Sequence, residues 1–315
     1  MYKRQDFDNS ASDDNSASCK GLKAGKALVI SGGSITIDAQ DDALHTDGDM
    51  TISGGECILS TGDDGAHAAL SLTVLDGKIT VLTSYEGLEA NQITLADGEL
   101  DITASDDGIN ANGGSDGFSG GFGGGFGGRR SDMNSQSGDM TPPDNSNMQT
   151  PPDGTTTDDT TDKQPVLLIT GGKITVNADG DGLDSNGDLR VEGGDITING
   201  PSNGGNGALD IGTENGGAGV IAGGTLIALG TSSMTENFGS TSTQCAFLVT
   251  MNSFGAGETI TITDSQGNVL YTGVTVKSAN SVVFSSPDLV VGETYTVTIG
   301  STLSLIHISE PTRLR

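Results

Sequence analysis

Acidic residues recur in this 315-residue chain at a nearly constant spacing before residue 112. A first row holds the residue before a corner and consists of Asp42, Asp64, Glu86, Asp107, Asp181 and Asn206. A second row lies three residues later and consists of His45, His67, Glu89, Asn110 and Asp184. A third row lies two residues beyond the second and consists of Asp47, Asn91, Asn112 and Asn186, with Ala69 as a gap. If the repeats stack, each row becomes a continuous column of polar side chains.

Such columns favour cation binding. Two carboxylates about 5 Å apart repel by about 3 kcal/mol at an effective dielectric constant of 20, and cations between the repeats relieve this repulsion. Ca²⁺ suits these columns because it takes carboxylate, amide and backbone oxygens as ligands. The metal candidates are Asp42, Asp64, Glu86, Asp107, Asp181 and Asp184. The candidates for contact with a bound ligand are Glu89, Asn110, Asn186 and Asn206. Turn chemistry alone is the alternative, since Asp, Asn and Gly adopt left-handed corners without any ligand.

The histidines and the enzyme motifs point to no specific chemistry. His45 and His67 lie one repeat apart, and we expect a stacked surface pair rather than a transition-metal site, because no third soft ligand aligns with them. The chain has no nucleophile elbow, HExxH motif or phosphate loop. A calcium-type lyase needs an Arg or Lys base, and no basic residue of the repeats accompanies an acidic corner. Paired carboxylates for glycoside hydrolysis remain open. Because the other enzyme motifs are lacking, a binding protein is favoured over an enzyme.

Short strands must position these rows. Marker glycines Gly33, Gly55, Gly77 and Gly98 follow one another at a nearly fixed period of about 22 residues, and a period of this length indicates a solenoid. Within each repeat, apolar and polar side chains alternate with period two, and Ile, Val, Leu and Thr are frequent. This pattern favours three short strands per turn. The sequence therefore predicts an all-β fold: a right-handed, single-stranded parallel β-helix of six to seven turns. One apolar column, formed by Leu44, Ala66, Leu88, Ile109 and Leu183, is expected to point inward, so the second and third rows face outward.

Composition restricts the partners. The chain has 14 basic and 42 acidic residues and a formal net charge of -28, which repels nucleic acid and anionic membranes and favours cations. No apolar run is long enough for a membrane span. Three cysteines without a CxxC motif argue against a disulfide framework. We expect a monomer.

Composition and the presence or absence of the repeat divide the chain into six segments. Residues 1–5 and 303–315 resemble translated sequencing adapters and are excluded from the fold, which implies an internal fragment whose signal peptide is missing. Repeats occupy residues 6–112 and 166–230, separated by a Gly- and Pro-rich insert at 113–165 that we expect to be flexible. Strands at 231–302 lack the period and are predicted to cap the solenoid, which otherwise exposes strand edges.

Several motifs carry a family resemblance, at residues 177–188, 203–210, 223–230, 285–289 and 292–295. Along these motifs the chain resembles the bacterial carbohydrate-binding β-helix family, across roughly residues 19–300. The resemblance implies a pectate-lyase-like fold, calcium at acidic corners, binding of acidic plant polysaccharide such as polygalacturonate, and a secreted or surface-attached location. Glu86 in place of Asp and Asn206 in place of an acid depart from the pattern, and the family's N-terminal coils are missing.

Three functions compete on this basis. Calcium-dependent, non-catalytic binding of an acidic polysaccharide is the first. A polysaccharide lyase or hydrolase acting on polyuronate is the second, and a structural or adhesive cell-surface protein is the third.

Overall fold

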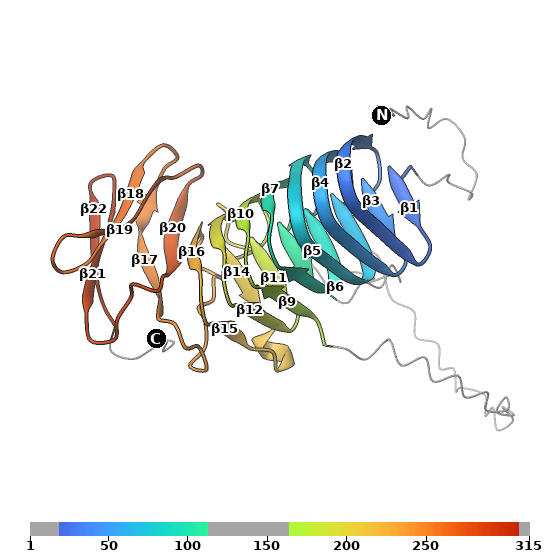
Figure 1. Cartoon of the computed structure of the whole chain (residues 1–315). Helices are drawn as coiled ribbons and strands as arrows, with labels where there is room; N and C mark the ends of the chain where they lie inside the picture. The colour runs from blue at the N-terminus through green and yellow to red at the C-terminus, as the bar shows by residue number, and fades with distance from the viewer. Residues whose placement is uncertain (1–18, 113–163, 309–315) are drawn as a thin grey trace, which may run out of the picture. The chain divides into compact units, whose positions relative to one another are not determined.

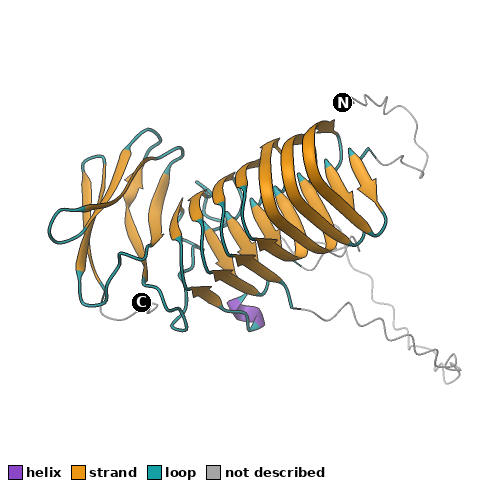
Figure 2. Cartoon of the chain, in the orientation of Figure 1, coloured by secondary structure: helices purple, strands orange, loops and turns teal. Residues whose placement is uncertain are grey.

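The computed structural model describes residues 19–112 and 164–308, which consist almost entirely of β-strands (Figures 1 and 2). The strands before the insert are β1 (Leu22–Ala24), β2 (Ala27–Ala39), β3 (Leu44–Thr46), β4 (Asp49–Thr61), β5 (Ala66–Thr83), β6 (Leu88–Leu95), β7 (Glu99–Ala104) and β8 (Ile109–Ala111). The next coils contain β9 (Val166–Ile169), β10 (Lys173–Ala178), β11 (Leu183–Ser185), β12 (Asp188–Val191), β13 (Asp195–Asn199), β14 (Leu209–Ile211), the 3-10 helix η1 (Thr213–Asn215), β15 (Gly219–Ile221) and β16 (Thr225–Gly230). The predicted insert and residues 1–5 lie outside the described residues, apart from residues 164 and 165.

Strands of successive turns pair in parallel, and they do so on three faces. The first face holds β1, β3, the start of β5, the start of β6, β8, β11 and β14, which pair in that order. Its register continues across the insert, because Ile109 pairs with Leu183. Figure 1 shows these strands stacked as rungs. The predicted β-helix is confirmed, with about six turns.

The apolar column is buried as predicted. Leu44, Ala66, Leu88, Ile109 and Leu183 are each 0% exposed. They belong to one core cluster that takes apolar side chains from all three faces. The alternation of side chains along each short strand sends one residue into this core and the next away from it. The core thus fixes which residues of each turn point outward.

Glycine corners set the stacking. The marker glycines have positive φ, 95° at Gly55 and 107° at Gly98, in the region that side chains disfavour. A second set follows the acidic corner and is required by close packing. At Gly108 an added Cβ would lie 2.2 Å from Val176 Cγ1 and 2.6 Å from the Gly182 carbonyl oxygen. The acid–glycine pairs therefore hold their acidic residues at fixed positions above one another.

The last coil is covered by antiparallel strands, which confirms the predicted cap. The cap strands are β17 (Ala246–Phe254), β18 (Thr259–Thr263), β19 (Val269–Val274), β20 (Ala279–Ser285), β21 (Thr294–Ile299) and β22 (Thr302–His307). Strand β20 pairs with β16 and with β17, and a separate sheet has the order β19-β18-β21-β22. The cap has its own core, which includes Phe284 and Tyr295. Strand β22 includes residues 303–307 of the segment that we expect to be adapter-derived.

Strands β18 and β19 form an antiparallel hairpin, and in its loop Asp264 Oδ1 accepts hydrogen bonds from the backbone N–H groups of Gln266 and Asn268. A search of the described residues for a long apolar helix able to cross a membrane gave none.

Candidate functional site: a polar column on the first face

The polar column lies along the middle of the first face. Each first-face strand has three residues in register, and the outer two point inward, so the middle one points away from the core. The middle positions, in order, are Lys23, His45, His67, Glu89, Asn110, Asp184 and Asp210. The structure thus brings the predicted second row together and extends it by one acid. The signal for Asp210 was available, since Leu209 occupies the inward position before it.

The first row is also assembled, with one correction. Backbone hydrogen bonds connect the corner residues of successive turns, for instance from Gly87 N to the Asp107 carbonyl and from Gly108 N to the Asp181 carbonyl. The next bond runs from Gly182 N to Gly207 O, so Gly207 and not Asn206 stands opposite Asp181. The prediction for Asn206 was wrong by one position because Leu183 pairs with Leu209, which makes this turn longer than the period.

Burial differs from the expectation for the second row. His45, His67 and Asn110 are 1%, 3% and 4% exposed, so the expected surface histidine pair is wrong. The cause is local: the corner residues on either side fold over the middle position. His45 Nδ1 lies 2.6 Å from Asp42 Oδ2, and His45 Nε2 lies 2.9 Å from Asp47 Oδ1. In the third row Asp47 and Asn186 are exposed.

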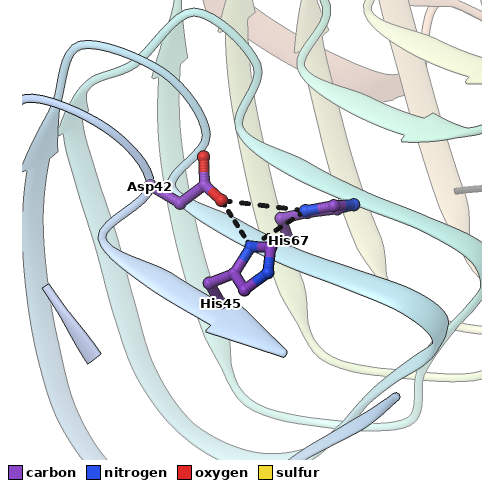
Figure 3. A group of neighbouring side chains, drawn as sticks. All are labelled: Asp42, His45 and His67. Carbon is purple, nitrogen blue, oxygen red and sulfur yellow. Dashed lines mark hydrogen bonds and ion pairs between the residues drawn. The ribbon is translucent and has the colours of Figure 1, made fainter. Parts of the chain in front are cut away.

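The two histidines meet a third ligand atom that the sequence interpretation missed. Their ring centroids are 4.9 Å apart, and their Nδ1 atoms are 3.1 Å apart. Asp42 Oδ2 lies 3.7 Å from His67 Nδ1. Figure 3 shows the carboxylate and the two rings turned toward one another. A repeat pattern compares only equivalent positions of different turns, whereas Asp42 reaches His45 from three residues earlier in the same turn.

Two lysines accompany acidic corners, and neither belongs to the basic residues of the coils that the sequence expectation covered. Lys20 Nζ lies 2.5 Å from Asp42 Oδ2 and 3.0 Å from Asp41 Oδ1. Lys277, between β19 and β20, lies 2.7 Å from Asp179 Oδ1. Lys20 precedes β1 and Lys277 lies in the cap, so the period gives no signal for either contact. Burial opposes ionisation of Asp42, but contacts with His67, Lys20 and His45 outweigh it and hold the pKa of Asp42 below its ordinary value.

Further along the column, no lysine or arginine of the described residues forms an ion pair with the carboxylates. Oxygen atoms of Asp107, Asp181 and Asp184 all lie within 4.8 Å of one another. Burial, the largest cause, and neighbouring carboxylates raise the pKa of five acids above the ordinary range. The values are about 10 for Asp64, about 8 for Glu86, about 6 for Asp107, about 7 for Asp181 and about 9 for Asp184. Protons or cations that neutralise these carboxylates would therefore stabilise this part of the column.

Turn chemistry explains only part of this group. Asp107 Oδ1 accepts a hydrogen bond of 2.7 Å from Asp181 N, and Asp181 Oδ1 accepts one of 2.5 Å from Gly207 N. These bonds use one oxygen of each residue to join neighbouring turns. In the described part of the chain, the Asp184 side chain has no hydrogen bond or ion pair. Asn110 donates to Glu86 Oε2 at 3.1 Å and to Asp107 Oδ2 at 3.5 Å. Its own Oδ1 is buried without a hydrogen-bond partner.

The remaining candidates lie nearby but do not converge on one point. Asp64 forms a second group with His67 and Glu89, whose ligand atoms are also within 4.8 Å of one another. Glu89 Oε1 accepts a hydrogen bond of 2.8 Å from Asn112 Nδ2. Asn186 is exposed and its backbone oxygen accepts a hydrogen bond from Asn215.

Comparisons with known proteins gave one match. A family model described as carbohydrate-binding domain-containing protein matches residues 3–66, a span that includes Asp42, His45 and Asp64. The searches of curated proteins and of solved structures gave no match. The matched span is less than a quarter of the chain. Together with the parallel β-helix, the match supports a β-helix of the carbohydrate-binding kind.

Proposed function

We propose that this protein binds acidic polysaccharide of the polygalacturonate type without cleaving it. Binding takes place outside the cell, through Ca²⁺ ions that the polar column holds. The observation that carries the proposal is the group formed by Asp107, Asp181 and Asp184 together with the unpartnered oxygen of Asn110. The group offers several oxygen atoms and, among the described residues, no ion pair to a basic side chain.

The chemistry of these donors favours a hard cation. Ca²⁺ takes six to eight oxygen ligands at about 2.3–2.6 Å, from carboxylates, amide carbonyls and water. Asp107 and Asp181 each use one oxygen in backbone hydrogen bonds, which orients the second oxygen. Asp184 and the Asn110 carbonyl supply further oxygens. These protein groups are fewer than the full number of ligands, so a bound Ca²⁺ keeps coordination positions for outside oxygens.

Charge connects the cation to the glycan. A chain with a net charge of -28 repels a polyanion at long range. Calcium ions with open positions remove this obstacle, because each ion is shared between protein carboxylates and a uronate carboxylate. The match of residues 3–66 to the carbohydrate-binding model supports a sugar ligand, and acidic sugar is the class that this chemistry recognises.

The lysines do not favour catalysis. A lyase base must accept a proton, and it must therefore be neutral. Burial lowers the pKa of Lys20, but hydrogen bonds to Asp42 and Asp41 outweigh burial and raise the pKa above its ordinary value. Lys20 thus remains protonated. Lys277 is paired with Asp179.

Retention on immobilised polygalacturonate tests the proposal. With Ca²⁺ the wild-type protein should be retained, and excess chelator should release it. The variant Asp184→Asn should lose retention, while the matched charge change Asp101→Asn, at an exposed position of another face, should retain it. Binding to a neutral glucan should not depend on Ca²⁺. Full retention in excess chelator would refute the mechanism.

Incubation of the protein with soluble polygalacturonate and Ca²⁺ separates binding from catalysis. We expect neither unsaturated nor reducing ends to accumulate. Products that require Lys20 or Lys277 would establish the lyase instead, and a lack of binding to any glycan would favour a structural or adhesive role.

A further inference from the structure

The strongest feature that the proposed function does not use is the buried group of Asp42, His45 and His67. The first two residues belong to one turn and His67 belongs to the next, so the group spans two rungs of the first face. All three residues are at most 3% exposed. We propose that they bind one divalent transition-metal ion of the Zn²⁺ class, which connects the two turns.

Distances among the three ligand atoms fit such an ion. Asp42 Oδ2, His45 Nδ1 and His67 Nδ1 are separated by 2.6, 3.1 and 3.7 Å. A circle through the three atoms has a radius of about 1.9 Å, so a point about 0.9 Å out of their plane is about 2.1 Å from each, which is the Zn–N and Zn–O bond length. The three ligand atoms thus already lie at bonding distance from one common point.

Outer contacts of the two rings support the same assignment. A histidine that ligates a metal donates its other ring N–H to a carboxylate or carbonyl, which fixes the ring. His45 Nε2 lies 2.9 Å from Asp47 Oδ1, and His67 Nε2 lies 3.7 Å from Glu89 Oε2. Each ring thus presents Nδ1 to the common centre, while Nε2 of His45 is within hydrogen-bond distance of a carboxylate and Nε2 of His67 lies only at ion-pair distance from one. The nearby carboxylates also offset the positive charge of Lys20, which donates to the same Asp42 oxygen.

A proton is the competing occupant of the centre. Without metal, a doubly protonated His45 can donate from Nδ1 to Asp42 and from Nε2 to Asp47, while His67 Nδ1 faces His45 as an acceptor. A metal ion would bind all three of these atoms directly, including His67 Nδ1. The proton is bonded to His45 and contacts His67 only through the His45 ring. Imidazole nitrogens distinguish this site from the Asp107 group, whose donors are all oxygens and suit a hard cation.

Zn²⁺ binding to the full chain tests the proposal. After removal of metals with a chelator, Zn²⁺ is titrated by calorimetry in excess Ca²⁺, which occupies the oxygen sites. We expect one equivalent to bind, a higher unfolding midpoint, and d–d bands of tetrahedral geometry when Co²⁺ replaces Zn²⁺. His67→Gln should weaken binding more than about 100-fold, and Asp47→Asn, which changes only an outer contact, by about 10- to 100-fold. Asp184→Asn should bind Zn²⁺ as the wild-type protein does.

Imidazole NMR signals give a second readout that does not depend on the folding of a variant. The chain has three histidines, and His307 on β22 is exposed and serves as an internal reference. One equivalent of Zn²⁺ should shift the signals of His45 and His67 and leave that of His307 in place. Unshifted His45 and His67 signals mean that the centre holds a proton only, which overturns the proposal. Equal Zn²⁺ affinity of His67→Gln and wild-type protein also overturns it.

Discussion

Neutralising Asp184 should stabilise the calcium-free protein, although the substitution removes a candidate ligand. Burial, then the charges of Asp107, Asp210 and Asp181, raise the pKa of Asp184 to about 9 from 3.8. A group whose folded pKa is raised binds more protons in the folded than in the unfolded state, so stability falls as pH rises from the unfolded toward the folded pKa. Each pH unit in this window removes about 1.4 kcal/mol.

The size of the effect follows from this window. A pH of 7 is about three units above the unfolded pKa of Asp184, so the wild-type protein loses about 4 kcal/mol of folding stability there. A Coulomb estimate is similar: the ligand oxygens of Asp107, Asp181 and Asp184 lie within 4.8 Å of one another, and two charges at that upper limit repel by about 3 kcal/mol at an effective dielectric constant of 20. An asparagine side chain at this position has nearly the same shape and carries no charge. In excess chelator, Asp184→Asn should therefore raise the unfolding midpoint at pH 7 by about 10 °C, and the difference should vanish near pH 4.

Thermal unfolding followed by circular dichroism measures this difference, with and without Ca²⁺. Calcium should raise the midpoint of the wild-type protein and leave that of Asp184→Asn almost unchanged. Asp101→Asn is the matched control and should behave as the wild-type protein under each condition. A lower midpoint for Asp184→Asn in chelator at pH 7 would refute the reasoning, since it would mean that the carboxylate stabilises the metal-free column.

Three further predictions concern the scaffold. Gly108→Ala should destabilise the coils by more than about 2 kcal/mol, because its Cβ would overlap the Val176 side chain; chemical denaturation measures this, and wild-type stability would contradict the close packing. Leu183→Ala opens a cavity at a fully buried position and should cost about 2–5 kcal/mol in the same assay, whereas a loss below about 0.5 kcal/mol would mean that the column is loosely packed. Tyr295→Phe leaves Val290 N without its hydroxyl partner at 2.8 Å and should cost about 1 kcal/mol; an unchanged denaturation midpoint would show that this bond does not hold the cap.

Sequence periodicity predicts the coils well because each repeat contains its own strand and corner signals. Leu44, Ala66 and Leu88 are identified as core residues by spacing alone, and the glycine corners fix the stacking. The period fails where a turn changes length, and this failure misplaced Asn206 and omitted Asp210. Burial of His45 was also out of reach, because it depends on how Asp42 and Asp47 fold over the ring. Contacts between distant parts of the chain, such as Lys277 with Asp179, have no signal in a repeat pattern.

The register between Ile109 and Leu183 has a consequence for how such chains can change. When Leu44 pairs with Ala66 in the first coils, the chain between them forms a loop of a single repeat. When Ile109 pairs with Leu183, the loop that is closed contains the whole insert as well. Closure entropy grows only with the logarithm of the closed length, so even a fully free segment would add about 1 kcal/mol at this rung. Corners can therefore accept long additions at little thermodynamic expense, while one extra residue inside a strand would reverse every side chain of that rung. Insertion at corners lets a repeat protein acquire new segments without a change in the register of its paired strands.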